Sequence, residues 1–290
     1  MIVSGLTLLF AVGCQSRQVA SPAAVPTVAA TSALPLDHGV AHAVELSPQE
    51  ITMTAKNAPL EGSDFDSNAD DPDILAIRQF KPGTPKAVYS SNFFEPLLPV
   101  DSLDVGQPWE IPRGAIEPFL HQFHPSASEK LIIDGAGSYG VVRAVSDSFL
   151  DIRTRTHAQL EIKPDIFLFP AQFEGRLLVN RVSGKVESFS LVVPTDHKLN
   201  VDFEINHGKN IVGMVLAPEF TLTSNTDPPA IQAWDEQISE SQAQELLRQQ
   251  FFAFEQLDWL PLDQAIKRAK ETKKPVFSIV IAGVLNDQSC

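Results

Sequence analysis

Short runs in which apolar and polar residues alternate dominate the middle of the chain. Several of them are rich in Val, Ile, Leu, Phe and Thr, namely YGVVRAV, FLDIRTRTHAQLEI, GRLLVNRV, VESFSLVV, LNVDFEI and GMVLAPEFTLTS. A period of two is typical of half-buried strands, and the Gly, Pro, Asn and Asp between the runs indicate turns. Because no long helical pattern intervenes, we expect mostly antiparallel pairing. The pattern predicts a β-rich domain over residues 75–235, with DGAGSYG (134–140) as a turn.

The period changes to that of a helix after NTDPPA (225–230). SESQAQELLRQQFFAF predicts one helix, and LDWLPLDQAIKRAKETKKP predicts a second, amphipathic helix with Leu262, Ile266 and Ala269 on one face. The next run, PVFSIVIAGV (275–284), is apolar enough to be a central strand. A helix, a buried strand and then a cysteine in a loop is the order in which a thioredoxin-like fold presents its redox centre. We therefore predict an α+β chain in which residues 236–290 form the N-terminal part of a thioredoxin-like α/β domain.

The N-terminus has the pattern of a secretory signal. MIVSGLTLLFAVGC places an apolar segment directly before Cys14, and AVGC resembles a bacterial lipobox, in which that cysteine is acylated after cleavage. We predict a lipoprotein signal peptide over residues 1–13, lipidation at Cys14, and a lipid-anchored location at the bacterial cell envelope. The departure is that no Lys or Arg precedes Arg17. The alternative is a buried N-terminal segment with a structural cysteine.

Residues 14–74 are predicted to be a tether followed by a short structured segment. Residues 15–36 are rich in Ala, Ser, Pro and Val, a composition that need not fold. Ser47 followed by Pro48 and Glu50 has the spacing of a capping box and predicts the start of a helix. The Asp-rich stretch EGSDFDSNADDPD (61–73) then predicts a solvated linker.

Composition excludes some classes of function. The 290-residue chain has a formal net charge of −14, whereas nucleic-acid binding usually requires a basic patch, so we expect no nucleic-acid partner. No stretch reaches the length of a membrane-spanning helix. Its two cysteines, Cys14 and Cys290, stand near opposite ends, so we expect no internal disulfide.

The last residues, AGVLNDQSC, resemble a family motif. They are similar to the stretch of the selenoprotein N family that leads into its selenocysteine, Gly-x-Leu-(Asp/Asn)-Asp-Gln-Ser-Cys followed by selenocysteine and Gly. The similarity extends upstream through DWLPLDQAIKRAKETKKPVFSI, FPAQFEGRLLVN and LVVPTDHKLNVDFE. More loosely, it includes EPLLPVDSLDVGQPWEIP and FHPSASE. It covers residues 80–290 approximately.

The resemblance implies that the chain is truncated at the residue before selenocysteine, whose UGA codon is read as a stop. Cys290 is then the resolving thiol of a thiol/selenol-disulfide oxidoreductase, and Asn286, Asp287, Gln288 and Ser289 support the redox loop. A selenol is ionised at neutral pH, whereas an unperturbed thiol is mostly protonated, so the selenol is the attacking group. The partners implied are a disulfide-bearing protein substrate and an unknown reductant, and the truncated chain is expected to be inactive.

Animal members of the family carry an EF-hand, and the resemblance implies that residues 14–74 contain only a degenerate EF-hand-like segment besides the tether. With Glu50 as the last ligand, the preceding ligand positions fall on Gly39, Ala41 and Ala43, which lack oxygen ligands. The spacing of Asp64, Asp66 and Asn68 is suitable, but Ala69 and Leu75 replace the required Gly and Glu. We therefore expect no calcium site.

The histidines give no metal site either. His121 and His124 lie close in sequence without an accompanying acidic or Cys cluster, and we expect ordinary structural histidines. His197 is expected to hydrogen-bond within a turn. We predict no metal ion and no cofactor other than the selenocysteine of a longer form.

A second hypothesis from another class is a non-catalytic lipoprotein whose β-rich domain binds a partner or scaffolds an envelope complex. The nucleotides after the Cys290 codon distinguish the two. UGA followed by an open frame supports the enzyme, and UAA or UAG without further coding potential supports the binding module.

Overall fold

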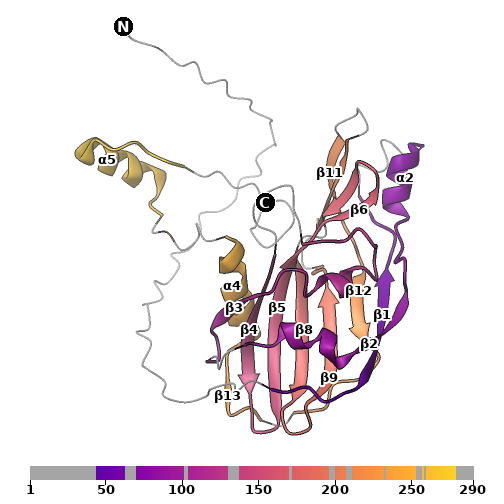
Figure 1. Ribbon diagram of the computed structural model, residues 1–290. Helices are drawn as coiled ribbons and strands as arrows, with labels where there is room; N and C mark the ends of the chain where they lie inside the picture. The colour runs from indigo at the N-terminus through magenta and orange to yellow at the C-terminus, as the bar shows by residue number, and fades with distance from the viewer. Residues whose placement is uncertain are drawn as a thin grey trace. The chain divides into compact units, whose positions relative to one another are not determined.

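Figure 1 shows the computed structural model of the chain. The structure describes residues 44–62, 70–100, 104–129, 137–169, 172–195, 200–206, 211–231, 233–252, 257 and 259–278. The predicted signal peptide, Cys14, the Asp64–Asn68 candidate, His197 and the motif 286–290 lie outside these residues.

Two antiparallel sheets contain all the strands of the described chain. The larger has the strand order β13-β4-β5-β8-β9-β12-β1-β2, with β3 also paired to β4, and the smaller has the order β11-β10-β7-β6. The prediction of a mostly antiparallel, β-rich α+β protein is confirmed. The strands of the larger sheet are β1 (Glu50–Asn57), β2 (Lys86–Ser90), β3 (Pro108–Ile111), β4 (Gly137–Val145), β5 (Phe149–His157), β8 (Phe173–Asn180), β9 (Lys185–Val192), β12 (Phe220–Ser224) and β13 (Glu236–Gln237).

Helices and the smaller sheet complete the described elements. The strands of the smaller sheet are β6 (Leu160–Lys163), β7 (Ile166–Phe169), β10 (Val201–Ile205) and β11 (Ile211–Val215). The helices are α2 (Pro72–Arg78), α3 (Glu117–Leu120), α4 (Glu240–Phe251) and α5 (Leu262–Thr272), with short 3-10 turns η1 (Ser91–Phe93) and η2 (Glu95–Leu97). None of the described helices is long and apolar enough to cross a lipid bilayer.

Alternation along the strands gives the larger sheet two different faces. On one face, apolar side chains such as Ile152 of β5 and its register partner Leu177 of β8 are fully buried. Phe94 and Phe119 pack on Phe189 of β9 at this face, with ring centroids 5.3 and 4.8 Å apart. The intervening residues of β5 point to the opposite face, because successive strand side chains alternate. The main hydrophobic core therefore lies on one side of the sheet, and a polar face lies on the other.

Helix α4 packs on the polar face, beside β4 and β5 (Figure 1). The side chain of Ser239 accepts a hydrogen bond from the Gln242 N–H, and the Gln242 side chain accepts one from the Ser239 N–H, so the helix begins with a capping box. Ala243 and Leu247 are buried against Val141 of β4. The first predicted C-terminal helix is confirmed, and it attaches the start of the C-terminal segment to the sheet.

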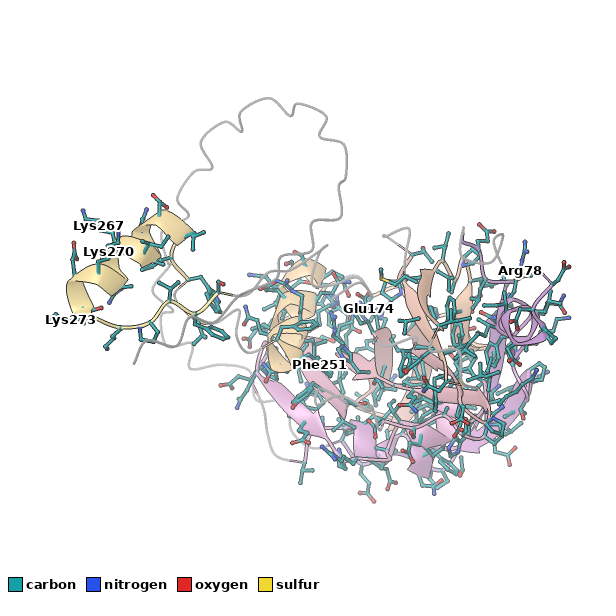
Figure 2. All side chains as sticks on the ribbon, turned by 90° about the horizontal axis from the view of Figure 1, so that it is seen from above. Arg78, Glu174, Phe251, Lys267, Lys270 and Lys273 are labelled. Carbon is teal, nitrogen blue, oxygen red and sulfur yellow. The ribbon has the colours of Figure 1, made fainter. Side chains whose placement is uncertain are left out.

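The second predicted helix is confirmed as α5, which ends at Lys273 in the left-handed conformation (φ +56°). Figure 2 labels Lys267, Lys270 and Lys273 along this segment, and Lys270 in the last turn and Lys273 at the C-cap complement the helix dipole. No residue of α5 is buried. The predicted strand over 275–284 is wrong for residues 275–278, which form no strand and include Phe277 at 77% exposure. Residues 279–284 lie outside the described chain.

The helix predicted from Ser47, Pro48 and Glu50 is wrong. Glu50 instead begins β1, which pairs with both β12 and β2. Ile51, Met53 and Ala55 are buried while the residues between them are not, so alternation along the strand decided the structure over the local capping pattern. The sheet thus extends beyond residues 75–235 at its N-terminal side through β1 and at its C-terminal side through β13.

DGAGSYG is only partly described, and its described part is strand rather than turn. Gly137 to Gly140 begin β4, and Gly140 pairs with Trp109 of β3. A Cβ atom at Gly140 would collide with the Trp109 indole. The glycine therefore allows the indole to lie directly on the neighbouring strand.

Candidate functional site

Asp151, near the start of β5, is the centre of an arginine cluster on the polar face. Its side chain is fully buried and accepts hydrogen bonds from three guanidinium groups. The nitrogen–oxygen distances are 2.6 Å from Arg143 of β4, 2.9 Å from Arg153 of β5 and 3.0 Å from Arg176 of β8. A buried carboxylate needs charged partners of this kind, because desolvation otherwise disfavours its ionised form. Asp151 therefore fixes three arginines side by side on three adjacent strands.

Glu240 connects this cluster to α4. Both of its carboxylate oxygens accept from Arg153, with Nε distances of 2.6 and 2.9 Å and an Nη2 distance of 2.7 Å. Such a bidentate arrangement is stronger and more directional than a single hydrogen bond. One helical turn later, Gln244 Nε2 donates to Glu174 Oε2 at 3.0 Å. The N-terminal half of α4 is thus attached to the sheet through polar contacts.

The C-terminal end of α4 is attached through aromatic contacts. The Phe251 ring, labelled in Figure 2, stacks on His157 of β5 with a centroid distance of 3.7 Å. The Arg155 guanidinium lies 5.7 Å from the centroid of Phe251 and 5.8 Å from that of Phe252. Cation–π contacts of this kind strengthen when they are shielded from water, and Arg155 is 4% exposed. The helix is therefore held at both ends.

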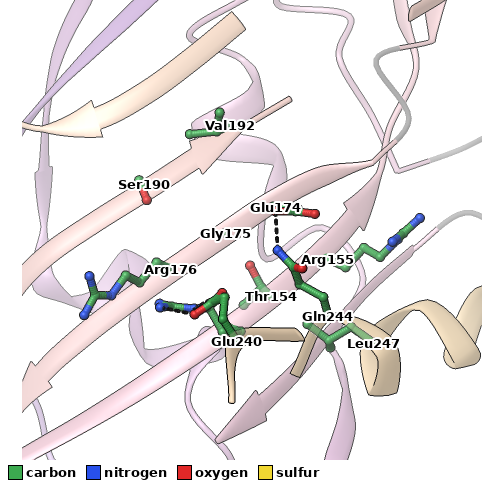
Figure 3. Close-up of a pocket in the computed structure, with 11 residues that line it drawn as sticks. Thr154, Arg155, Glu174, Gly175, Arg176, Ser190, Val192, Glu240, Gln244 and Leu247 are labelled. Atoms are coloured by element: carbon green, nitrogen blue, oxygen red, sulfur yellow. Dashed lines mark hydrogen bonds and ion pairs between the residues drawn. The ribbon is translucent and has the colours of Figure 1, made fainter. Parts of the chain in front are cut away.

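Between α4 and the strands lies a cavity of about 180 Å³, which we call the α4 groove (Figure 3). Its polar lining comes from both sides, with Arg153, Glu174, Arg176 and Ser190 on the strands and Glu240 and Gln244 on the helix. Val192 and Leu247 add apolar surface. Fixed guanidinium groups beside a partly apolar cavity are suited to binding a small anionic group.

Comparison with curated proteins identifies the relationship of the chain. Human selenoprotein N is 27% identical over an alignment of 266 residues, which covers 71% of this chain and 45% of the human protein. The mouse protein is 26% identical over 266 residues, covering 71% and 48%, and the zebrafish (Danio rerio) protein is 29% identical over 217 residues, covering 62% and 39%. The chain is a homologue of selenoprotein N. It spans about half the length of these relatives or less.

Homology to selenoprotein N confirms the family resemblance inferred from the sequence motifs. No family model matches the chain, and no solved structure matches it. The geometry of the α4 groove is therefore known from this structure alone.

The redox residues expected from the selenoprotein N motif, Cys290 and residues 286–289, lie outside the described chain, as does Cys14. Of the two neighbouring histidines, His124 is 2.8 Å from the Ser126 hydroxyl through Nδ1, and burial lowers its pKa. Within the described ranges, no group of three or more His, Cys, Asp or Glu side chains could hold a metal ion.

The Asp151 cluster was not predicted from the sequence. Asp151, Arg153 and Arg155 stand at every second position of FLDIRTRTH, so a strand places them on one face. An acidic residue and two arginines on one face of a predicted strand indicate an ion-pair cluster, and this pattern was available in the sequence. The contribution of Glu240 was not visible, because it stands 87 residues from Arg153.

Glu129 is a second buried carboxylate, on the opposite side of β4 from the α4 groove. It accepts hydrogen bonds from the Gly114 N–H and the Ser138 hydroxyl, both at 2.5 Å. Burial raises the pKa of Glu129, and the nearby Glu117 carboxylate also raises it, while the two hydrogen bonds and Arg113 oppose this shift. The folded state therefore binds the Glu129 proton more tightly than the unfolded chain does.

This shift makes stability depend on pH with a definite sign. The stability contributed by Glu129 is fully present below the unfolded-state pKa and is lost as pH rises through the raised folded-state pKa. Glu129→Gln, which stays neutral, is therefore expected to gain stability relative to the parent as the pH rises above about 4.3, the ordinary pKa of a glutamate. Urea unfolding of both proteins from below to above this pH measures it. The control is Glu110→Gln, at an exposed residue of β3, and parallel curves for Glu129→Gln and the parent would contradict the assignment.

Proposed function

We propose that the full-length protein is a thiol/selenol-disulfide oxidoreductase of the selenoprotein N type, with Cys290 as the partner of a selenocysteine that follows it. The observation that carries the proposal is homology to selenoprotein N, together with the NDQSC motif that ends in Cys290. The relatives are named selenoproteins, and in the family motif the selenocysteine comes directly after this cysteine.

The proposed reaction reduces a substrate disulfide by two electrons. The selenolate attacks one sulfur of the disulfide, so that a Se–S bond forms, the S–S bond breaks and the first substrate thiolate leaves. The Cys290 thiolate then attacks selenium, forms the intramolecular selenylsulfide and releases the second substrate thiolate. Two protons convert the released thiolates to thiols, and an external dithiol reduces the selenylsulfide again. Oxidation of a dithiol substrate is the same sequence in reverse.

Attachment of the C-terminal segment to the β-rich domain is consistent with this proposal. Glu240 and Phe251 hold the two ends of α4 on the sheet, and the chain continues from α4 towards Cys290. The β-rich domain is then a fixed base for a segment that carries the reactive cysteine.

The proposal includes a location at the cell envelope. Acylation of Cys14 would tether the protein to the membrane on the extracytoplasmic side, where disulfide-bearing substrates occur. Mass spectrometry of the N-terminal peptide tests this part separately, because recovery of an unmodified chain through Met1 would exclude the lipid anchor.

The test of the selenoprotein proposal is the coding sequence beyond Cys290 and the selenium content of its product. We expect a UGA codon followed by an open frame beginning with glycine, and one selenium atom per chain when that frame is expressed with its selenocysteine-insertion element. A UAA or UAG codon without further coding potential would refute the redox proposal.

The α4 groove favours a second candidate, a non-catalytic binding module. Its basis is a lined cavity in the β-rich domain, which needs no selenium chemistry. Ligand binding without selenium in the product would support this candidate over the enzyme.

A further inference from the structure

We propose that the α4 groove binds a carboxylate group, with Arg176 as its principal donor. The inference goes beyond the redox proposal and stands independently of it, because every residue that carries it lies in the described β-rich domain and α4. It assigns a carboxylate-binding site to this selenoprotein N homologue.

Arg176 has unused donor capacity at the groove. An arginine side chain carries five N–H donors in a rigid plane. Among the described residues, Arg176 makes one hydrogen bond, from Nε to Asp151 at 3.0 Å. Its remaining N–H groups are left for solvent or a ligand, and its side chain is 36% exposed. The Ser190 hydroxyl, on the register partner of Arg176, also makes no hydrogen bond to a described residue.

Asp151 orients Arg176 before any ligand arrives. Because the carboxylate of Asp151 is fully buried and shared with Arg143 and Arg153, the Arg176 guanidinium is restrained at its Nε end. A restrained donor loses less conformational entropy on binding than a mobile surface side chain. Two further guanidinium groups line the groove, but Arg153 is bound to Glu240 and Arg155 donates to Gln172, so Arg176 is the donor that a ligand would reach.

The local charge favours a monoanion. Among the residues that the structure describes, the charged side chains of the groove and of the cluster behind it are four arginines (Arg143, Arg153, Arg155 and Arg176) and three carboxylates (Asp151, Glu174 and Glu240). This leaves one net positive charge in a chain whose formal charge is −14. One carboxylate from a ligand would neutralise the site, whereas a dianion such as a phosphate ester would leave an excess of negative charge beside Glu174 and Glu240.

The volume and the apolar lining of the α4 groove restrict the size and the polarity of the group that carries the carboxylate. The cavity of about 180 Å³ is smaller than the roughly 300–1,000 Å³ of pockets for drug-sized ligands. Val192 and Leu247 provide apolar contacts. The ligand is therefore a short apolar group that carries a carboxylate, which is the chemistry of a small carboxylic acid and of a peptide C-terminus ending in an apolar residue.

Isothermal titration calorimetry on the full 290-residue chain tests the proposal with matched ligand pairs. The pairs are hexanoate against hexanamide, and acetyl-Ala-Ala-Val with a free C-terminus against its C-terminal amide. We expect saturable binding of at least one acid, and about a 10–100-fold loss of affinity for its amide, as for one charge-assisted hydrogen-bonded pair. Binding of the small acid alone would indicate a metabolite-type ligand, and tighter binding of the peptide would indicate a chain terminus.

Variants assign the binding to the groove. Arg176→Met keeps the aliphatic stem and is expected to remove the preference for acid over amide, while Arg78→Met, at an exposed arginine of α2, keeps it. Ser190→Ala is expected to weaken the acid a few-fold without disturbing the Asp151 cluster. Glu174→Gln removes a negative charge and is expected to tighten binding. Thermal unfolding of each variant verifies that it is folded.

Three results would overturn the proposal. They are no saturable binding of either acid by the parent chain, equal affinity for acid and amide, or an acid preference that survives in folded Arg176→Met. The first two outcomes are measured on the parent chain, so they apply even if Arg176→Met fails to fold. None of these measurements depends on selenium, so the groove and the redox proposal can fail separately.

Discussion

Asp151→Asn is expected to lower the free energy of unfolding by about 3–5 kcal/mol, the usual cost of removing one partner from a buried ion pair. The amide keeps the shape of the carboxylate but removes its charge, and three guanidinium groups converge on it within 3.0 Å. Without the negative charge, Arg143, Arg153 and Arg176 repel one another on adjacent strands. Because Asp151 is fully buried, water cannot replace the lost interaction.

Asp147→Asn is the matched control for this measurement. It is the same substitution on the same stretch of chain, but Asp147 is exposed, and such changes usually alter stability by less than about 0.5 kcal/mol. Urea unfolding of parent, Asp147→Asn and Asp151→Asn gives the comparison. A loss below about 1 kcal/mol for Asp151→Asn would mean that the arginine cluster contributes little to the fold.

The hydrophobic pattern of a single segment predicted those elements whose conformation depends mainly on that segment. The alternation in FLDIRTRTH predicted β5, and the helical period of SESQAQELLRQQF predicted α4. At Glu50–Asn57 the capping pattern at Ser47 predicted a helix, and the alternation of ITMTA, which indicates a strand, was overlooked. The pairing of β1 with β12 decides for the strand, and this pairing joins Met53 to Ser224, far along the chain.

The candidate site was harder to predict because its contacts are non-local. The sequence showed Asp151 and Arg153 on one face of a strand, but it could not show that Arg176 and Glu240 converge on them. Those contacts depend on the β5–β8 register and on the docking of α4. Motif resemblance supplied the redox residues, which no composition or spacing argument would have identified.

Cys290→Ser is expected to abolish turnover in the selenocysteine-containing protein while leaving the first chemical step intact. The selenolate would still attack a disulfide, but no thiol would remain at position 290 to displace the substrate from selenium. The mixed selenylsulfide therefore accumulates. The parent would instead form the selenylsulfide between adjacent residues, a strained bridge that an external dithiol reduces easily.

A matched control separates this chemistry from a general disturbance of the loop. Ser289→Ala changes the neighbouring side chain by one oxygen atom but leaves the Cys290 thiol in place. Because the resolving thiol is still present, it is expected to accumulate no adduct, whatever the loss of a loop-supporting hydroxyl does to the rate of turnover. If Ser289→Ala also trapped the substrate, the adduct would report a distorted loop rather than a missing resolving thiol.

Mass spectrometry of the Cys290→Ser selenocysteine-containing protein, after exposure to a disulfide-bearing peptide, tests the proposed function most directly. The account predicts a covalent adduct with the mass of one peptide thiol on the selenocysteine, released by dithiothreitol, with no steady-state turnover. Absence of the adduct together with parental turnover would contradict the assignment of Cys290 as the resolving residue.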